Sequence, residues 1–156
     1  GGSEYYGHFG YLGSNVPEVR PHKFKSLYKA LSQAIDAERL ASAHGVFRGG
    51  LGIHLAMVAM GGCLGLNVDL NRVARENAER DDIILFSESA GRFIVTVSPS
   101  DRAAFESHFN GQPFACIGAV TEDPILRVRG IAGNELVALS VEALKKAWKR
   151  PFGDLI

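Results

Sequence analysis

A glycine-rich stretch between two apolar segments is the part of this sequence best suited to chemistry. It reads Ala43-His44-Gly45-Val46-Phe47-Arg48-Gly49-Gly50-Leu51-Gly52, with strand-like residues before it and helical apolar spacing after it. A strand that breaks at paired glycines and opens a helix presents unpaired N–H groups at the positive end of the helix dipole. Glycine also lets a phosphate approach the backbone closely. The stretch therefore predicts an anion site at Gly49 and Gly50.

The same stretch also fits a purely structural connection. No Gly-Lys-Ser/Thr closes it, so it is not a Walker A loop, and its glycine spacing is not that of a dinucleotide-binding fingerprint. Small residues allow a strand and a helix to pack closely even where no ligand binds. The residues alone leave both interpretations open.

The elements around this stretch follow from the apolar spacing. Residues 23–38 have the period of an amphipathic helix, and residues 40–44 resemble a short strand. A helix buried on most of its surface follows the glycines and ends at Gly61-Gly62. Alternation predicts a strand at residues 64–70. The predicted apolar face of the first helix consists of Phe24, Leu27, Leu31 and Ile35.

The second half of the chain shows shorter elements. Residues 71–82 predict a loop or a short solvated helix, and two strands, Ile83–Phe86 and Arg92–Val97, are expected on either side of a turn at 87–91. Ser98 is the expected cap of a helix that reaches Phe109. The remaining predictions are strands at 114–120, 125–131 and 136–139, the last of which leads through Ser140 into a terminal helix to Lys149.

This element order indicates an α+β domain with a mixed, largely antiparallel sheet covered by helices. Residues 1–21 are too apolar for a free linker and too glycine-rich for a helix, so we expect an irregular interdomain arm. Its aromatic side chains pack either on this domain or on another one. Residues 22–156 form the predicted α+β domain, and the absence of an initial methionine suggests a piece of a longer chain.

The composition excludes several classes of protein. The 156 residues carry 17 basic and 17 acidic side chains, whereas a nucleic-acid or membrane surface needs a basic excess. No apolar run approaches the roughly 20 residues that span a bilayer. Cys63 and Cys116 lie in apolar surroundings, which favours two buried thiols over a disulfide and gives no support to a zinc site.

Four stretches carry a resemblance to a known family: Gly2-Ser3-Glu4-Tyr5, Ser42–Leu51, Leu85–Phe93 and Ile117–Thr121. In the same order they resemble the C-terminal domain of the synthetase subunit in the phosphoribosylformylglycinamidine synthase (formylglycinamide ribonucleotide amidotransferase) family. This family belongs to the aminoimidazole ribonucleotide synthetase superfamily. The four stretches together span nearly the whole chain.

The resemblance implies a cytoplasmic, ATP-dependent carbon–nitrogen ligase of purine biosynthesis. In this family ATP activates the formamide oxygen of formylglycinamide ribonucleotide, and ammonia from a glutamine amidotransferase subunit displaces the phosphate. The implied partners are that subunit, the remaining domains of the same synthetase chain and a small-molecule ribonucleotide. The implied cofactors are ATP or ADP, with Mg²⁺ held mainly by the absent domains. We assign no catalytic residue or metal ligand to this chain, and expect it to be inactive alone.

The glycine stretch departs from the family pattern His-Asp-Val/Ile-Ser-Asp/Glu-Gly-Gly-Leu. Gly45, Phe47 and Arg48 replace the first acid, the serine and the second acid. The loss of two carboxylates removes metal or hydroxyl contacts, whereas the amides of Gly49 and Gly50 remain. Arg48 adds a cation, which favours an anion as the ligand.

The predicted phosphate- or nucleotide-binding residues are His44, Arg48, Gly49, Gly50, Leu51, Ser87, Glu88, Ser89 and Arg92. Several have a simpler alternative. His44 is more plausibly structural, Arg48 fits an exposed charge equally well, and residues 87–89 also fit a polar turn. For Arg92 we favour an ion pair with Glu88 over an anion contact, and His54 we expect in a core or interface.

The main interpretation is a domain that contributes a phosphate- or nucleotide-binding cleft and a scaffold. Two other functions stay open. One is a non-catalytic assembly module, in which the aromatic arm docks partner domains and the glycine stretch is structural. The other is another enzyme of the same superfamily.

Overall fold

The computed structural model describes residues 1–155, without the side chains of Asp154 and Leu155. Ile156, the last residue of the predicted domain, lies outside this part. The chain divides into two compact units, each made of two separate segments. The first unit comprises Gly1–Leu51 and Phe86–Ala115, and the second comprises Gly52–Leu85 and Cys116–Ile156. The division predicted at residues 21 and 22 stays a prediction.

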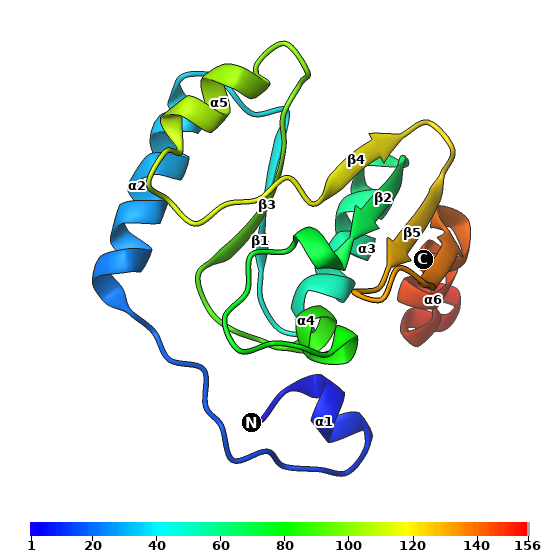
Figure 1. The fold of residues 1–156 in the computed structure, drawn as a ribbon. Coiled ribbons are helices and arrows are strands. Elements are labelled where there is room, and N and C mark those ends of the chain that lie inside the picture. Colours follow the sequence, from blue (N-terminus) through cyan, green and yellow to red (C-terminus); the bar gives the residue numbers. More distant parts are fainter. Residues whose placement is uncertain (156) are drawn as a thin grey trace. The chain divides into compact units, whose positions relative to one another are not determined.

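The first unit combines helices with a two-stranded sheet (Figure 1). Its elements are α1 (Glu4–His8), α2 (Pro21–Asp36), β1 (Ser42–Val46), β3 (Arg92–Thr96) and α5 (Arg102–His108). β1 and β3 run antiparallel, with Ser42 opposite Thr96 and Val46 opposite Arg92. The core of this unit lies where α2 and α5 meet β3. Its buried members are Ala30, Leu31, Ala34, Phe105 and Phe109, against which Phe93, Val95 and Val97 pack.

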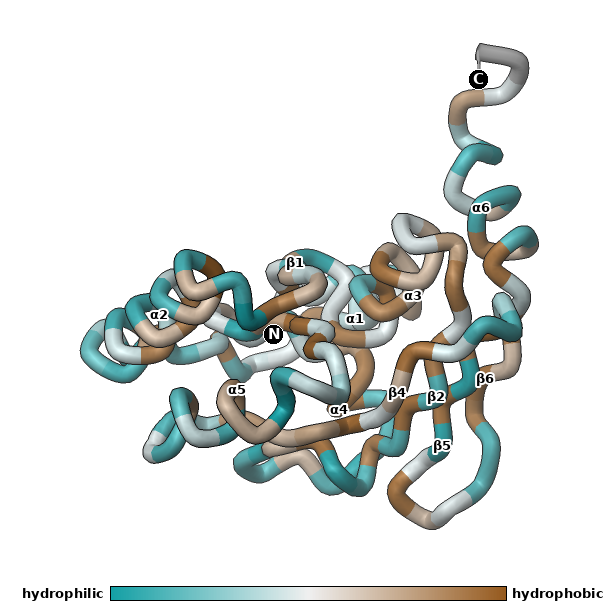
Figure 2. The backbone as a smooth tube through the Cα atoms, turned by 90° about the horizontal axis from the view of Figure 1, so that it is seen from above, coloured by the Kyte–Doolittle hydropathy of each residue, from teal (hydrophilic) through white to brown (hydrophobic). Residues whose placement is uncertain are grey.

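The predicted amphipathic helix is confirmed as α2, and Figure 2 shows hydrophilic and hydrophobic stretches alternating along it. Its buried face differs from the predicted one, because Ile35 is 50% exposed whereas Ala30 and Ala34 are buried. The close approach of α5 explains this choice, since small alanines leave room for the stacked rings of Phe105 and Phe109.

The second unit contains a four-stranded sheet of order β4-β2-β5-β6. Only β2 and β5 are parallel, and the other neighbours are antiparallel. Residues Leu66, Val68, Leu126 and Val128 share one face, which is buried. The elements are α3 (Gly50–Gly62, beginning in the first unit), β2 (Gly65–Asp69), η1 (Leu70–Arg72), α4 (Asp81–Phe86, ending in the first unit), β4 (Gly118–Thr121), β5 (Ile125–Arg129), β6 (Glu135–Ser140), α6 (Val141–Lys149) and η2 (Arg150–Leu155).

The predicted fold class is confirmed: helices accompany mixed, largely antiparallel sheet, although the strands form two sheets rather than one. The predicted helix after the glycines is α3, and the predicted terminal helix is α6, which begins after Ser140. The Ser140 hydroxyl accepts a hydrogen bond from the Ala143 amide at 3.1 Å, as a helix cap does.

The prediction of a strand at Ile83–Phe86 is wrong, because these residues belong to helix α4. A short apolar run is compatible with either element, and here Asp81 and Asp82 favour the helix by placing negative charge at its N-terminus. The Asp81 carboxylate also accepts a hydrogen bond from the Ile131 amide at 2.8 Å. The predicted hairpin around residues 87–91 therefore does not form, and β3 pairs with β1 instead.

Two predicted boundaries also need correction. The arm contains a short helix, α1, in which the Ser3 hydroxyl accepts a hydrogen bond from the Tyr6 amide at 3.3 Å. This cap stabilises a helix of only five residues that includes Gly7, a residue type of poor helix propensity. Helix α5 begins at Arg102 rather than beside Ser98, because the Ser98 hydroxyl binds the Asp101 amide within a preceding turn.

The two cysteines are free thiols in the described part of the chain, but both are exposed rather than buried as predicted. Cys63 follows the last turn of α3, and Cys116 lies just before β4. Burial was inferred from apolar neighbours in the sequence, yet both residues stand at the ends of elements, where their side chains reach solvent.

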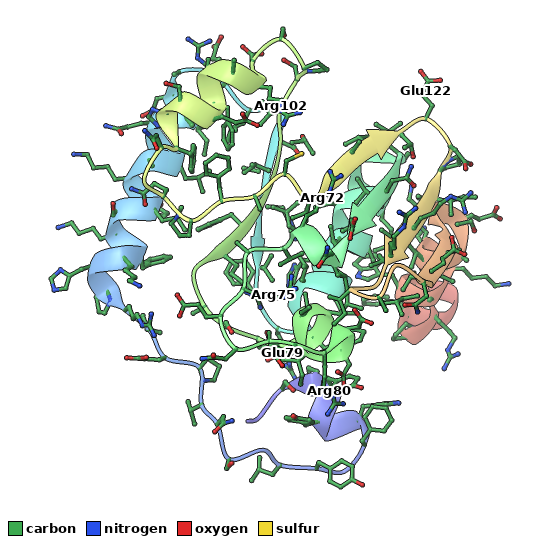
Figure 3. The ribbon with its side chains drawn as sticks, in the orientation of Figure 1. Arg72, Arg75, Glu79, Arg80, Arg102 and Glu122 are labelled. Atoms are coloured by element: carbon green, nitrogen blue, oxygen red, sulfur yellow. The ribbon has the colours of Figure 1, made fainter. Side chains whose placement is uncertain are left out.

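A charged loop, residues 73–80, connects η1 to α4 (Figure 3). Arg75 organises its start, because one guanidinium nitrogen donates to the carbonyls of Leu70, Asn71 and Val73 at 3.1–3.2 Å. The predicted loop or short helix is thus a loop that opens with the short helix η1. Over the residues that the structure describes, no helix has the length and apolar character needed to cross a membrane.

Candidate functional site

The glycine loop, residues 47–50 of the glycine-rich stretch, leads from β1 into α3 in the first unit. β1 ends at Val46, and Gly49 and Gly50 follow with φ angles of +92° and +75°. Side chains rarely adopt this left-handed conformation, so the chain needs glycine at both positions to turn into the helix. The Gly50 amide donates to the Phe47 carbonyl at 3.1 Å. One of the two amides predicted to bind an anion therefore closes the turn itself.

The other predicted donor, the Gly49 amide, binds a carboxylate of the same chain. Glu88 accepts a hydrogen bond from the Gly49 amide at 2.9 Å and another from the Glu4 amide at 2.8 Å, both through Oε1. A charged acceptor between two N–H groups forms stronger hydrogen bonds than a neutral one. The chain thus supplies an anion at the predicted position itself, as the half-buried side chain of Glu88, which lies 39 residues from Gly49 in sequence.

Arg92 holds the loop that carries Glu88. Its guanidinium donates to the Ser87 carbonyl and, through Nε at 3.1 Å, to the Ser89 carbonyl. These two carbonyls flank Glu88, so one side chain fixes the backbone on both sides of it. Burial lowers the pKa of the Arg92 guanidinium from its ordinary value. The prediction of an ion pair between Arg92 and Glu88 is wrong, because the two side chains bind different partners.

Arg48 forms an ion pair with Glu4 on the surface of the same region. The Glu4 carboxylate lies 2.6 Å from Nε and 2.5 Å from Nη2, while the side chains remain 79% (Arg48) and 53% (Glu4) exposed. Exposure limits such a pair to less than about 1 kcal/mol. Arg48 is therefore an exposed charge with a partner, held beside the glycine loop.

The N-terminal arm completes the site. The Tyr5 ring stacks on Phe86 with ring centres 4.8 Å apart and planes within 5°. Glu4 and Tyr5 were missing from the predicted site residues, although both belong to the first stretch that carried the family resemblance. Only the fold shows that the arm returns to the glycine loop.

The other predicted residues lie at the edges of this region. His44 is half-buried on β1 opposite Ile94, and Leu51 is a buried residue in the first turn of α3. Ser87 and Ser89 contribute the carbonyls that Arg92 binds. His54, which we expect in a core or interface, belongs to the second unit and is 5% exposed.

The arrangement holds one anion, the Glu88 carboxylate, on the amides of Glu4 and Gly49. Among the described residues, no three His, Cys, Asp or Glu side chains are placed to hold a metal ion. An external phosphate would reach the Gly49 amide by exchange with the Glu88 carboxylate, since both are anionic acceptors.

A family model described as "AIR synthase related protein, C-terminal domain" matches residues 3–131. The chain belongs to this family. The matched residues include the whole candidate site, whereas β6 and α6 follow them. The resemblance inferred from the four stretches is therefore confirmed.

Named relatives of this AIR synthase related domain are longer proteins. The phosphoribosylformylglycinamidine synthase subunit PurL of Limosilactobacillus fermentum is 34% identical over 140 residues, which are 90% of this chain and 17% of that protein. The solved structure of Thermotoga maritima PurL complexed with FGAR has 25% identity and a TM-score of 0.73, covering 83% of this chain and 22% of its own. The same PurL complexed with ATP has 26% identity and a TM-score of 0.68, covering 77% and 21%. The chain thus spans about a fifth of the length of the proteins it matches.

Proposed function

We propose that the chain is the C-terminal domain of the synthetase subunit of phosphoribosylformylglycinamidine synthase. This ATP-dependent ligase converts formylglycinamide ribonucleotide to formylglycinamidine ribonucleotide. The observation that carries the proposal is the Glu88 carboxylate, whose Oε1 binds both Glu4 and Gly49. This carboxylate brings together in one place three of the four stretches that carry the family resemblance. The names of the PurL relatives support the same conclusion.

In this proposal the domain contributes a scaffold and one wall of a phosphate- or nucleotide-binding cleft. The ligand is ATP or ADP, and Mg²⁺ is supplied mainly by other domains. A ligand phosphate takes the place of the Glu88 carboxylate at the Gly49 amide, and Arg48 supplies a nearby positive charge. The proposed binding residues remain His44, Arg48, Gly49, Gly50, Leu51, Ser87, Glu88, Ser89 and Arg92.

The proposed partners are the remaining domains of the synthetase, its glutamine amidotransferase subunit and the ribonucleotide substrate. The balanced net charge argues against nucleic acid and membrane surfaces as partners. We place the enzyme in the cytoplasm.

A non-catalytic assembly module is the second candidate, and one observation favours it. Both glycine amides already have acceptors within the chain, Glu88 for Gly49 and the Phe47 carbonyl for Gly50. A loop closed in this way serves as a rigid connection without any ligand. On this view the stacked Tyr5 and the α1 helix position the arm for neighbouring domains.

A charge placed in the loop distinguishes the two candidates. In a synthetase polypeptide that carries this domain, Gly49→Asp sets a second carboxylate beside Glu88 and should weaken ATP or ADP binding at least about tenfold. Gly133→Asp is the matched control, because Gly133 has a similar φ of +86° and open space around it. Unchanged nucleotide affinity in a folded Gly49→Asp variant would leave the assembly module as the better explanation.

A further inference from the structure

A cysteine and a lysine in the second unit lie in direct contact, away from the glycine loop. Lys145 Nζ, on α6, lies 2.9 Å from Cys63 Sγ, at the end of α3. The contact is exposed, and 82 residues separate the two positions in sequence. A nucleophilic sulfur and an amine nitrogen are thus held within reach of each other and of solutes.

The end of α3 fixes the backbone at Cys63. Cys63 has a φ of +54°, the Leu64 amide donates to the Ala59 carbonyl, and the Cys63 amide donates to the Met60 carbonyl. This pair of hydrogen bonds is the Schellman motif that ends a helix, and it normally uses glycine at the left-handed position. The Cys63 thiol also donates to the Met60 carbonyl at 3.7 Å, while the sulfur accepts from Lys145.

We propose that Cys63 and Lys145 form a reversible covalent cross-link when the chain meets a peroxide. The Cys63 sulfur attacks hydrogen peroxide, the O–O bond breaks, and a sulfenic acid and water result. The neutral Lys145 amine then attacks that sulfur, an S–N bond forms, and the S–O bond breaks to release a second water. The net change is one thiol, one amine and one peroxide giving a sulfenamide and two waters.

Proximity is what favours this reaction over its competitors. An amine held against the sulfur reacts as an intramolecular partner, with an effective concentration far above that of free thiols or amines. An excess of an external thiol reverses the link, because two thiols become a disulfide while Cys63 and Lys145 return to their original state. The cross-link would tie the end of α3 to α6, whose only buried residue in the described part of the helix is Val141.

The second exposed cysteine provides an internal comparison. The Cys116 thiol donates to the Gly118 carbonyl at 3.7 Å, so this thiol contacts an oxygen rather than an amine. Cys116 should therefore oxidise without forming a link to lysine. Replacing it by serine also removes the disulfide between Cys63 and Cys116, which would show the same mass loss of two hydrogens.

The test uses the whole chain with Cys116→Ser, treated with hydrogen peroxide and examined by intact mass and peptide mapping. We expect the loss of two hydrogens, a peptide that links residues 63 and 145, and recovery of the original mass with dithiothreitol. Lys145→Met should abolish the linked peptide and let dimedone trap at least about tenfold more sulfenic acid at Cys63. Lys146→Met, one residue along the same exposed helix, should behave like the parent.

Matching circular dichroism and melting temperature of the reduced variants establish that each is folded. The proposal is overturned if the folded parent forms no linked peptide, or if the link retains an oxygen atom. It is equally overturned if Lys145→Met loses the two hydrogens as readily as Lys146→Met.

Discussion

Removing the Glu88 carboxylate tests whether the chain itself supplies the anion of the glycine loop. Glu88→Ala leaves the amides of Gly49 and Glu4 without their acceptor. A hydrogen bond to a charged group contributes about 1.5–3 kcal/mol when buried, and the Gly49 bond is part-buried whereas the Glu4 bond is exposed. Taking the low end of this range for the Gly49 bond and a fraction of it for the Glu4 bond, we expect Glu88→Ala to lower the free energy of unfolding by about 2 kcal/mol. Glu88→Gln keeps an acceptor oxygen and should lose about 1 kcal/mol.

Two measurements on the same variants check this magnitude. Urea denaturation gives the free energy of unfolding, and hydrogen exchange of the Gly49 amide reports the local opening, which should become about 30-fold more frequent. Glu122→Ala is the control, because Glu122 is an exposed carboxylate in the turn between β4 and β5 (Figure 3). If Glu88→Ala matched Glu122→Ala in both measurements, the carboxylate would contribute nothing to the loop and the reasoning would fail.

Further substitutions test the backbone and side chains of the site, of α3 and of the four-stranded sheet. Gly118→Ala should cost about 3 kcal/mol in urea denaturation, because a Cβ would lie 1.9 Å from the Asn67 carbonyl oxygen. Gly49→Ala should lower the free energy of unfolding by about 1–2 kcal/mol, because residue 49 has a positive φ. Gly61→Ala, in open space on α3, should raise it by up to about 1 kcal/mol. Melting temperatures compare the two variants. Arg92→Ala should cost about 2 kcal/mol and speed amide exchange across residues 87–91, and a lysine there should restore only part of it.

Local signals in the sequence were sufficient where the fold follows from neighbours along the chain. The paired glycines correctly predicted where α3 begins, because their left-handed φ values arise from the turn itself. Ser140 correctly predicted the start of α6, since a cap needs only an amide three residues later. The prediction of a strand at Ile83–Phe86 failed because this apolar run carries no period. The helix that forms instead begins at Asp81, whose carboxylate accepts a hydrogen bond from the distant Ile131 amide.

The candidate site depends on contacts that local patterns do not encode. Glu88 and the Gly49 amide are 39 residues apart, and Glu88 and the Glu4 amide are 84 apart. The sequence favoured Arg92 as the partner of Glu88 because the two are close along the chain and opposite in charge. In the fold, Arg92 instead binds the carbonyls around Glu88, which leaves the carboxylate free to cross to the glycine loop.

The departures of the glycine stretch from the family pattern make sense as one coupled change. A Cβ at Gly45 would lie 2.4 Å from the Phe47 ring, so an acid at the first position and this ring cannot occupy the loop together without displacement of the ring. An acid at position 48 would set a like charge against Glu4, whereas Arg48 forms an ion pair with it. Both changes remove negative charge from a loop whose amide already binds the Glu88 carboxylate. Where the family pattern has carboxylates, this loop thus has contacts that tie it to the N-terminal arm.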